Sequence, residues 1–332
     1  MDNLQTVWNW QPALYLFLGG MGAGAFIAAA VLFFIDKDGH KKTISTSIWA
    51  AAACIIVGLV LLLTELIFPL RGLLLWQSFS NFSSWMAIGA WVLFAAVIIF
   101  VIAGLLTTDK IMGIFFKKDS ALKALALPTL IVLVVGAVLA LGVAAYTGIL
   151  LMSAPGIPLW NTWLLPCLFT VSALDTGIAL VVVVSAIHAK KEKMSSKVHK
   201  LSELAVMALV VLELIVLAVF IVVMLSGNGS SGSAATTATE SIKILLQGTL
   251  APLFWGLFIV IGLVVPLAAA VLVTFVHKAP KEGDDAKKGV NFSLIGAIGA
   301  LVGGCTLRFL IVLAGLHANY VTDAVEQILT RL

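Results

Sequence analysis

The sequence predicts an all-α integral membrane protein that crosses the bilayer about eight times. Of its 332 residues, 61% are hydrophobic and only 11% are charged, and the mean hydropathy is +1.14. A soluble core does not need that much apolar surface, so a lipid bilayer is the solvent that this composition implies. Nearly all the lysines lie in the segments between apolar runs, where they are explained by membrane orientation, so we expect no nucleic acid among the partners despite the net charge of +4.

Eight apolar runs are each longer than the roughly 20 residues that a helix needs to cross about 30 Å of hydrocarbon. We expect helices because unpaired backbone groups are costly in lipid and because the runs lack the alternation of barrel strands. The first run is preceded by no basic residue and no cleavage pattern, so we expect it to stay in the mature protein. The predicted spans lie near residues 13–35, 44–69, 84–106, 125–151, 162–188, 201–225, 248–276 and 291–316.

The polar segments that separate these runs alternate in character along the sequence. Segments after the first, third, fifth and seventh runs are rich in lysine, whereas those on the other side contain only Arg71, Lys243 and Arg331. By the positive-inside rule the lysine-rich side is cytoplasmic and both termini are outside. The lysines concerned are Lys37, Lys41, Lys42, Lys110, Lys117, Lys118, Lys123, Lys190, Lys191, Lys193, Lys197, Lys200, Lys278, Lys281, Lys287 and Lys288.

The Gly- and Ser-rich stretch 226–237 is expected to be a flexible outer loop, and residues 317–332 are expected to form a short outer tail. Small residues spaced four apart, at Gly20, Gly24 and Ala28 and again at Gly296, Ala300 and Gly304, predict close helix packing.

Ligands for a resident redox centre are missing from the predicted spans. Haem-bearing membrane subunits place histidine pairs inside their helices, whereas the five histidines here lie at the ends of runs or between them. Cys54, Cys167 and Cys305 are scattered singly, without the spacing of an iron–sulfur site. We therefore expect neither haem nor an iron–sulfur cluster in this protein.

Ionisable side chains inside the predicted spans are the best functional candidates, because each costs at least about 2.5 kcal/mol to insert. Asp175, Glu213 and Arg308 lie within the fifth, sixth and eighth runs. They are consistent with a proton path from the cytoplasm to the outer leaflet. They are equally consistent with a buried charge network that fixes helix packing, in which one arginine compensates two acids.

Glu65 and Tyr146 are predicted to meet at the outer ends of the second and fourth spans. A carboxylate beside a phenol suits proton exchange with a quinol, whose oxidation releases two protons and two electrons. The alternative is an interfacial ion pair between Glu65 and Arg71, with Tyr146 serving as an interfacial anchor. Because the protein lacks a redox centre of its own, the electrons would have to pass to another subunit.

Several short stretches resemble the NrfD/PsrC family, the membrane subunits of polysulfide-reductase-like complexes. The resemblance runs through essentially all eight spans, and the order of the stretches is more specific than any one of them. They are residues 15–26 (YLFLGGMGAGAF), 65–71 (ELIFPLR), 84–86 (SWM), 89–91 (GAW), 146–151 (YTGILL), 158–161 (PLWN), 165–174 (LPCLFTVSAL) and 303–308 (GGCTLR).

The resemblance implies a haem-free anchor in the bacterial inner membrane that binds menaquinone or ubiquinone at the outer leaflet. It also implies two four-helix transmembrane bundles, residues 1–151 and 162–316. A ferredoxin-like iron–sulfur subunit would exchange electrons with the anchor and pass them to or from a molybdopterin catalytic subunit. The quinone-site candidates that it implies are Asn9, Gln11, Glu65, Arg71 and Tyr146. Similar proteins often have an aspartate followed by a Gly-Arg-Pro-like turn where this sequence has Glu65 and, six residues later, Arg71.

Two other functions remain open on the sequence alone. Glycine-rich and proline-interrupted helices, such as the seventh run with Pro252 and Pro266, also occur in secondary transporters. A passive anchor that only holds soluble subunits at the membrane is the second alternative. Substrate uptake by the purified protein would indicate a transporter, and the absence of copurifying quinone would indicate a passive anchor.

Overall fold

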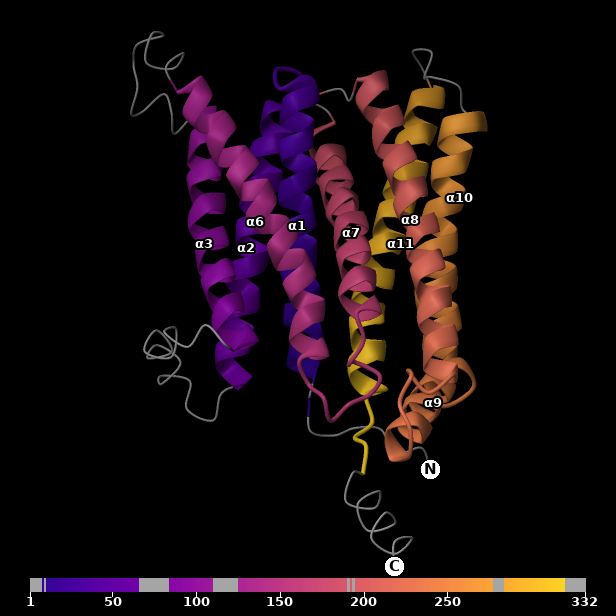
Figure 1. The fold of residues 1–332 in the computed structure, drawn as a ribbon. Coiled ribbons are helices and arrows are strands. Elements are labelled where there is room, and N and C mark those ends of the chain that lie inside the picture. Colours follow the sequence, from indigo (N-terminus) through magenta and orange to yellow (C-terminus); the bar gives the residue numbers. More distant parts are fainter. Residues whose placement is uncertain are drawn as a thin grey trace, which may run out of the picture.

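The structure is a computed structural model that describes residues 8, 10–65, 84–109, 125–189, 192, 195–276 and 284–319. For residues 65, 196, 276 and 284–290 it describes the backbone only. Within these ranges, eight helices are long and apolar enough to cross a membrane, as predicted, and they stand side by side (Figure 1). The helices are α1 (Trp10–Asp36), α2 (Lys41–Glu65), α3 (Trp85–Thr107), α6 (Ala126–Met152), α7 (Leu164–His188), α8 (Ser196–Leu225), α9 (Ser233–Leu246), η2 (Leu253–Val264), α10 (Val265–Val271), η3 (Leu272–Val276) and α11 (Asp284–Leu313).

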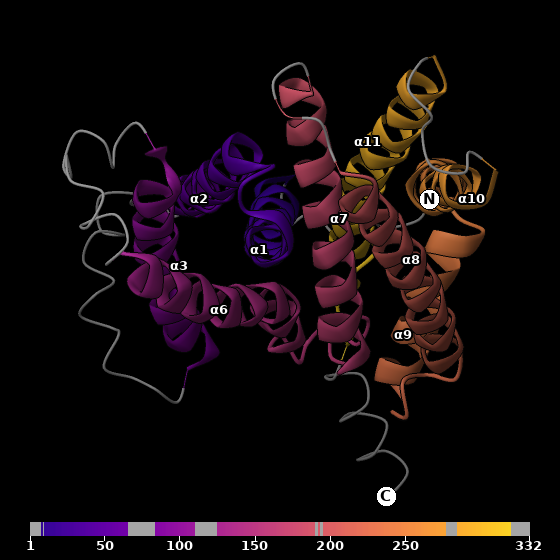
Figure 2. The ribbon, with the colours of Figure 1, turned by 90° about the horizontal axis from the view of Figure 1, so that it is seen from above.

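Seen along the helix axes, the first four membrane helices lie on one side and the remaining four on the other (Figure 2). Helices α1, α2, α3 and α6 pack around one apolar core, while α7, α8, α11 and the continuous helix η2–α10–η3 pack around a second. Helix α1 also packs closely along α7, so the two groups share a long contact. That each group behaves as a separate half, divided near residues 151 and 162, stays a prediction.

Glycine allows α1 and α7 to cross at almost the closest distance that two backbones permit. A Cβ atom added to Gly24 would overlap the carbonyl group of Ala173, and one added to Gly177 would overlap the backbone of Gly24. Gly20, one turn earlier, faces Ala173 as well. The close packing predicted for this glycine series is confirmed, and only residues without a bulky side chain are compatible with it.

The seventh membrane helix is wound more loosely than the others over part of its length. Residues Leu253–Val264 are π-helical, and Pro266 follows at the start of α10. Proline has no N–H to donate to the preceding turn, which is one known cause of irregular winding. Gly262 in this segment lies against Gly303 of α11, and Gly296 lies against Pro266 and Ala269, so the small residues of α11 also serve close packing.

The prediction of a flexible loop over residues 226–237 is wrong in its second part. Only a tight turn is present before α9 begins at Ser233, and Gly227, Asn228, Gly229 and Gly232 adopt positive φ angles there. The side chain of Asn228 donates hydrogen bonds to the carbonyl oxygens of Pro158 (3.1 Å) and Asn161 (2.9 Å), which tie the turn to the α6–α7 connection.

Helix α9 is amphipathic, and the spacing of its apolar residues indicates a helix that composition alone does not reveal. Its buried residues include Ala234, Ala238, Ile242 and Leu245, which recur at helical spacing, whereas Glu240 and Lys243 are exposed. Small and hydroxylated residues such as those of α9 are common in linkers, so composition predicted a loop. Burial of the apolar face on α8 and η2 stabilises a helix instead.

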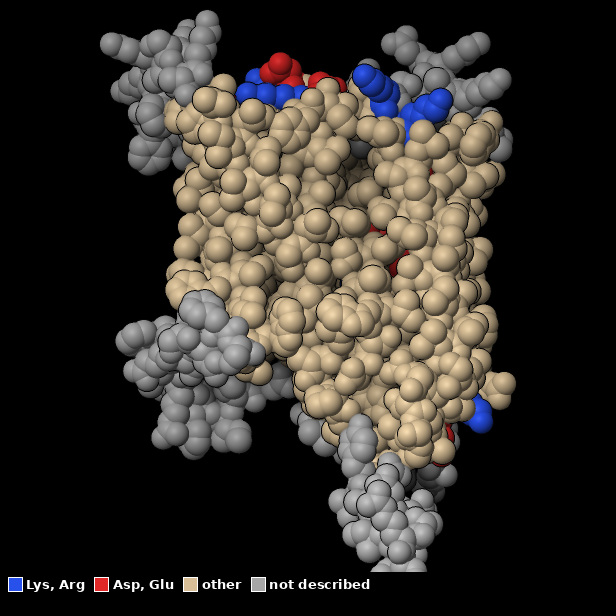
Figure 3. Space-filling model, in the orientation of Figure 1, with Lys and Arg blue, Asp and Glu red and all other residues tan. Residues whose placement is uncertain are grey.

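Basic side chains of the described residues gather at one end of the molecule (Figure 3). This end carries the α1–α2 turn and the α7–α8 connection, and we call it the lysine end. Helix α9, which contains Lys243, lies at the opposite end (Figure 1), as the sequence predicts for this lysine. The separation of lysines agrees with the sequence analysis, whereas the side of the membrane that each end faces stays a prediction.

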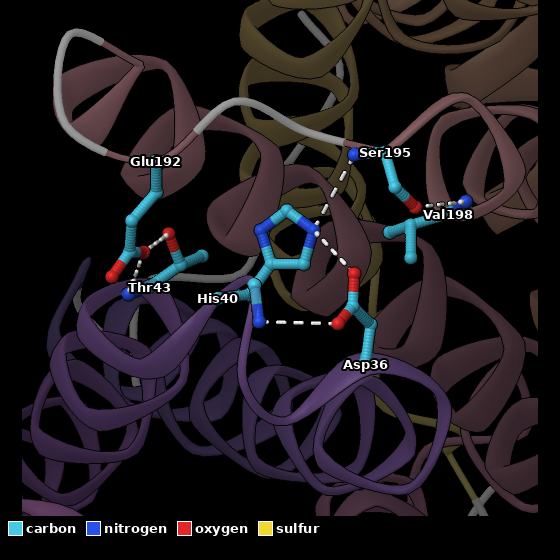
Figure 4. A network of polar contacts seen from close by, with 7 residues as sticks. Asp36, His40, Thr43, Glu192, Ser195 and Val198 are labelled. Atoms are coloured by element: carbon cyan, nitrogen blue, oxygen red, sulfur yellow. Dashed lines mark hydrogen bonds and ion pairs between the residues drawn. The ribbon is translucent and has the colours of Figure 1, made fainter.

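Two polar contacts join the halves at the lysine end (Figure 4). The carboxylate of Glu192 accepts hydrogen bonds from the backbone N–H of Lys42 (2.7 Å) and from the backbone N–H and hydroxyl of Thr43 (both 3.0 Å). It thereby caps the first turn of α2, a helix to which it is not adjacent in sequence. Close by, the buried imidazole of His40 lies 3.6 Å from Asp36 and accepts a 3.5 Å contact from the N–H of Ser195.

The α1–α7 crossing predicts a position-specific cost of adding a single methyl group. Gly24→Ala should lower the free energy of unfolding by about 1–3 kcal/mol, because the new Cβ atom has no room beside Ala173. Gly256→Ala is the matched control, since nothing lies within 4 Å of a Cβ atom built there. Thermal unfolding of the purified protein in detergent would measure both, and equal stability of the two variants would contradict the packing described.

The cap on α2 predicts a pH-dependent contribution to stability. Burial raises the pKa of Glu192, but the hydrogen bonds from Lys42 and Thr43 and the charge of His188 outweigh it, so the pKa lies below its ordinary value of 4.5. The stabilisation is therefore complete above about pH 4.5 and is lost as acidification protonates the carboxylate. Glu192→Ala should lower stability at pH 7 by about 1 kcal/mol.

The same substitution should have little effect once the pH falls below the lowered pKa, because the parent has then lost its charged cap. Thermal unfolding at pH 7 and at progressively lower pH checks this, with Glu240→Ala on the exposed face of α9 as the control. A difference between parent and Glu192→Ala that persists unchanged into acid would show that the capping charge is not its source.

Candidate functional site

Arg308 lies fully buried where α1, α7 and α11 meet. One terminal nitrogen donates hydrogen bonds to the Ser172 hydroxyl (2.5 Å) and to the Gly304 carbonyl (3.2 Å), and the other donates to the Phe169 carbonyl (3.0 Å). The guanidinium also lies 4.7 Å from the centre of the Phe169 ring. Helix α7 therefore provides most of the partners for an arginine of α11.

Glycine and serine make room for this arginine. A Cβ atom on Gly20 would lie 3.3 Å from a terminal nitrogen of Arg308, so a larger residue in α1 would press on the guanidinium. Gly304 lies against Thr176 of α7 at the same level. The small residues that the sequence analysis assigned to helix packing thus also form the walls around the buried charge.

Two buried acids belong to the same region: Glu213 of α8, which interacts with Arg308, and Asp175 of α7, which interacts with Glu213. Glu213 interacts electrostatically with both Arg308 and Asp175, and Ser172 is a hydrogen-bonding neighbour of its carboxyl group. Ser172 therefore lies between the guanidinium and the Glu213 carboxyl group. Across the described ranges neither acid forms a direct ion pair with Arg308; Ser172 is the neighbour that Arg308 and Glu213 share, and Asp175 interacts with Glu213.

Several polar atoms of this cluster are left without hydrogen-bond partners among the described residues. They are Oδ1 of Asp175, Oε1 of Glu213 and Nε of Arg308. Most buried polar atoms in proteins are paired, so three orphans within one cluster mark a site that can accept a water molecule or a proton. In Figure 3 the apolar face is hollowed between α7 and α8 at mid-height, and acidic atoms are visible in the hollow.

Tyr146 lies near the end of α6 that is opposite to the lysine end, and its side chain is almost completely buried. Its ring fills the space over Gly89 in α3, where even a Cβ atom would overlap it. The next two residues of α6 face other helices, since Thr147 contacts Gly19 of α1 and Gly148 lies against Pro166 of α7. Tyr146 therefore belongs to the α3–α6 contact, away from the Arg308 cluster.

The remaining quinone-site candidates are described to different extents. Gln11 lies in the first turn of α1, the central helix of the first half, and its buried Oε1 atom has no hydrogen-bond partner among the described residues. Glu65 is the last residue of α2, but its side chain is outside the described part, as are Asn9 and Arg71 entirely. The predicted meeting of Glu65, Arg71 and Tyr146 is thus not tested.

A third buried acid, Glu203, was not recognised from the sequence. Glu203 of α8 accepts a 2.5 Å hydrogen bond from the hydroxyl of Ser293 in α11, and His199 lies 3.9 Å from the same carboxylate oxygen. The spacing of His199 and Glu203, one helical turn apart at the start of an apolar run, was the available signal. It was hidden because the neighbouring lysines made this stretch look like an ordinary solvated helix end.

Metal coordination has no candidate in the part of the protein that the structure describes. Across those residues no group of three or more His, Cys, Asp or Glu side chains is placed to hold a metal ion. The polar clusters around Arg308 and Glu203 offer carboxyl, hydroxyl, imidazole and guanidinium groups, which are suited to proton exchange and hydrogen bonding.

Comparison with known proteins gives a consistent assignment. The family described as "Polysulphide reductase, NrfD" matches residues 1–318. The sequence is 36% identical to the C subunit of polysulfide reductase from Wolinella succinogenes over 52% of this protein and 56% of that one. It is 30% identical to protein NrfD of Escherichia coli over 58% of this protein and 63% of that one.

A third relative is matched over nearly its whole length. The NrfD homologue of Haemophilus influenzae is 29% identical over 93% of this protein and 94% of that one. The first two alignments, in contrast, span less than two thirds of the relatives' lengths. Because the family match runs through all eight membrane helices, this multi-pass membrane protein belongs to the NrfD family of polysulphide reductase membrane proteins.

Proposed function

We propose that this protein is the haem-free, quinone-binding membrane anchor of an oxidoreductase complex. It exchanges electrons between a quinol, either menaquinol or ubiquinol, and a ferredoxin-like iron–sulfur subunit. That subunit connects the membrane to a molybdopterin catalytic subunit. One relative is named as the C subunit of polysulfide reductase, and a subunit so named works beside other subunits.

The observation that carries this proposal is the family match over residues 1–318, which includes every helix that contributes to the candidate sites. The protein has many apolar helices and few polar side chains between them, as expected of a subunit that serves a lipid-soluble carrier. The proposed location is the bacterial inner membrane, with the lysine end cytoplasmic and the quinone site at the opposite end.

The helix ends that bear the quinone-site candidates all lie at the lysine-poor end of the molecule (Figure 1). These are the start of α1 with Gln11, the end of α2 with Glu65 and the end of α6 with Tyr146. A buried amide oxygen without a donor, as in Gln11, fits a hydroxyl group of a bound quinol. When bound, a quinol supplies two electrons and two protons to the site.

Within this proposal, Glu65 accepts or delivers a proton at the ring and Tyr146 orients it by hydrogen bonding. A carboxylate at the edge of the hydrocarbon can exchange protons with the outer water, and a phenol can donate or accept without carrying charge. Arg71 and Asn9, both outside the described residues, are proposed to complete the site. The roles of these residues extend from the family resemblance.

The buried cluster of Asp175, Glu213 and Arg308 is proposed to carry protons across the membrane. Gly20, beside the Arg308 guanidinium, is nine residues along α1 from Gln11, a rise of about 14 Å. The cluster thus lies deeper in the membrane than the proposed quinone site, and α1 passes both. The orphaned atoms of both acids support exchange of protons more than a static ion pair, because an ion pair would satisfy them.

Glu65→Gln tests the quinone site. We expect quinol oxidation by the assembled complex to fall by about 100-fold or more, because an amide cannot accept the proton that a positioned carboxylate accepts. The complex should still assemble, since the two side chains have nearly the same shape. Rates are measured with a soluble quinol analogue, and subunit content is measured by gel analysis of the purified complex.

The matched control for that experiment is Glu240→Gln, which alters an exposed acid on α9 in the other half. Normal turnover of Glu65→Gln would remove Glu65 from the site. If no quinone copurified with the complex, the passive-anchor function would be supported. Substrate uptake into vesicles by this protein alone would support the transporter function.

Glu213→Gln tests the proton path separately. If protons cross through the buried cluster, turnover is electrogenic, and the charge moved per electron should fall at least about tenfold in the variant. Complexes reconstituted in proteoliposomes and loaded with a potential-sensitive dye provide the measurement. Equal membrane potentials in parent and variant would eliminate Glu213 from the path and favour the structural role of the cluster.

A further inference from the structure

The buried carboxyl group of Glu203, near the lysine end, belongs to neither of the sites proposed above. Glu203 and Ser293 are both buried, and their 2.5 Å hydrogen bond links α8 to α11. His199, one turn closer to the lysine end, lies 3.9 Å from the same oxygen and is about one fifth exposed. A buried acid is therefore connected to the surface through an imidazole.

The surroundings of Glu203 differ from those of a structural ion pair. In the described ranges no lysine or arginine lies within ion-pair distance of it, so its charge is not permanently compensated. A carboxylate whose neighbours are a hydroxyl and an imidazole has groups beside it that can pass a proton to it or take one from it. By contrast, Glu192 at the same end is fixed as an acceptor by three donors.

The position of Glu203 continues the line of buried acids along α8. Glu203 and Glu213 are ten residues apart on α8, a rise of about 15 Å. Asp175 of α7 interacts electrostatically with Glu213. Nearby, the buried hydroxyl of Thr274 has no partner among the described residues, and its segment η3 packs against both α8 and α11.

We propose that Glu203, with His199 and Ser293, is the entrance through which protons from the lysine end reach Asp175 and Glu213. This inference rests on the proposed proton path of the preceding section. It adds a loading site at which the path meets water and assigns it to the contact between α8 and α11.

In this proposal a proton moves from His199 to Glu203 and then inward to Asp175 and Glu213. A protonated His199 releases its proton to the Glu203 carboxylate, which becomes a neutral acid, and the imidazole is reprotonated from water. The neutral acid then gives its proton to a short series of water molecules leading to the Asp175 and Glu213 carboxyl groups. Ser293 holds the carboxylate in place and accepts a hydrogen bond when it is protonated. No electrons move, and the charge of one proton crosses about half of the membrane.

The test uses the assembled complex in proteoliposomes, with Glu203→Gln beside the parent. Three quantities are measured: the quinone that copurifies, the electron transfer rate in the presence of an uncoupler, and the charge moved per electron without it. We expect the charge moved per electron to fall at least about tenfold, while copurifying quinone stays at the parental amount. Glu240→Gln, on the exposed face of α9, should match the parent in all three.

The possible outcomes distinguish failure of the proton entrance from failure of the proposed function on which it rests. Parental charge movement in Glu203→Gln would overturn the entrance alone. Electron transfer without charge movement in the parent would overturn the proton path and the entrance together, and absence of quinone and of quinol oxidation in the parent would overturn the proposed function.

If the complex with Glu203→Gln does not assemble, a milder variant provides the test. Ser293→Ala keeps the acid and removes only its hydrogen-bond donor, so charge movement should fall between the values for the parent and for a blocked path. Glu203→Asp should restore part of the activity because it restores a carboxyl group. Parental charge movement in Ser293→Ala, with Glu203→Gln unassembled, would overturn the entrance and leave Glu203 a packing residue.

Discussion

The guanidinium group of Arg308 must be solvated by protein because the hydrocarbon offers it no partner. Its two terminal nitrogens donate to Ser172, to the Phe169 carbonyl and to the Gly304 carbonyl of its own helix, and its face lies on the Phe169 ring. These contacts require α7 and α11 to lie side by side and α1 to present glycine at the same level. The arrangement of the second half, and its contact with the first, depends on satisfying this one charge.

Polar groups are distributed unequally between the halves. The described part of the second half contains the buried acids Asp175, Glu203 and Glu213 in addition to Arg308, whereas the described core of the first half is almost entirely apolar. The proposed quinone site uses the lysine-poor ends of first-half helices, where a lipid-soluble ring can arrive from the bilayer. This division would let the first half bind the carrier while the second half moves protons.

The candidate site was predictable only in part. Asp175, Glu213 and Arg308 were identifiable because charges inside apolar runs are rare, and the structure brings them together. Their mode of association was not, since Ser172 is one of many hydroxyl residues in the sequence and only the packing of α7 on α11 places it beside Arg308. Glu203 was missed because charge at the end of an apolar run looks solvated until Ser293 is packed against it.

Hydrophobicity and length by themselves determined the number, type and approximate limits of the membrane helices, because a span must be apolar and must satisfy its own backbone. The spacing of small residues likewise indicated which helix faces pack closely. Only the tertiary structure decided which helices are neighbours, that α9 folds where composition suggested a loop, and that Glu192 caps the distant α2. These features depend on contacts between residues far apart in the sequence, and a local pattern contains no information about its distant partner.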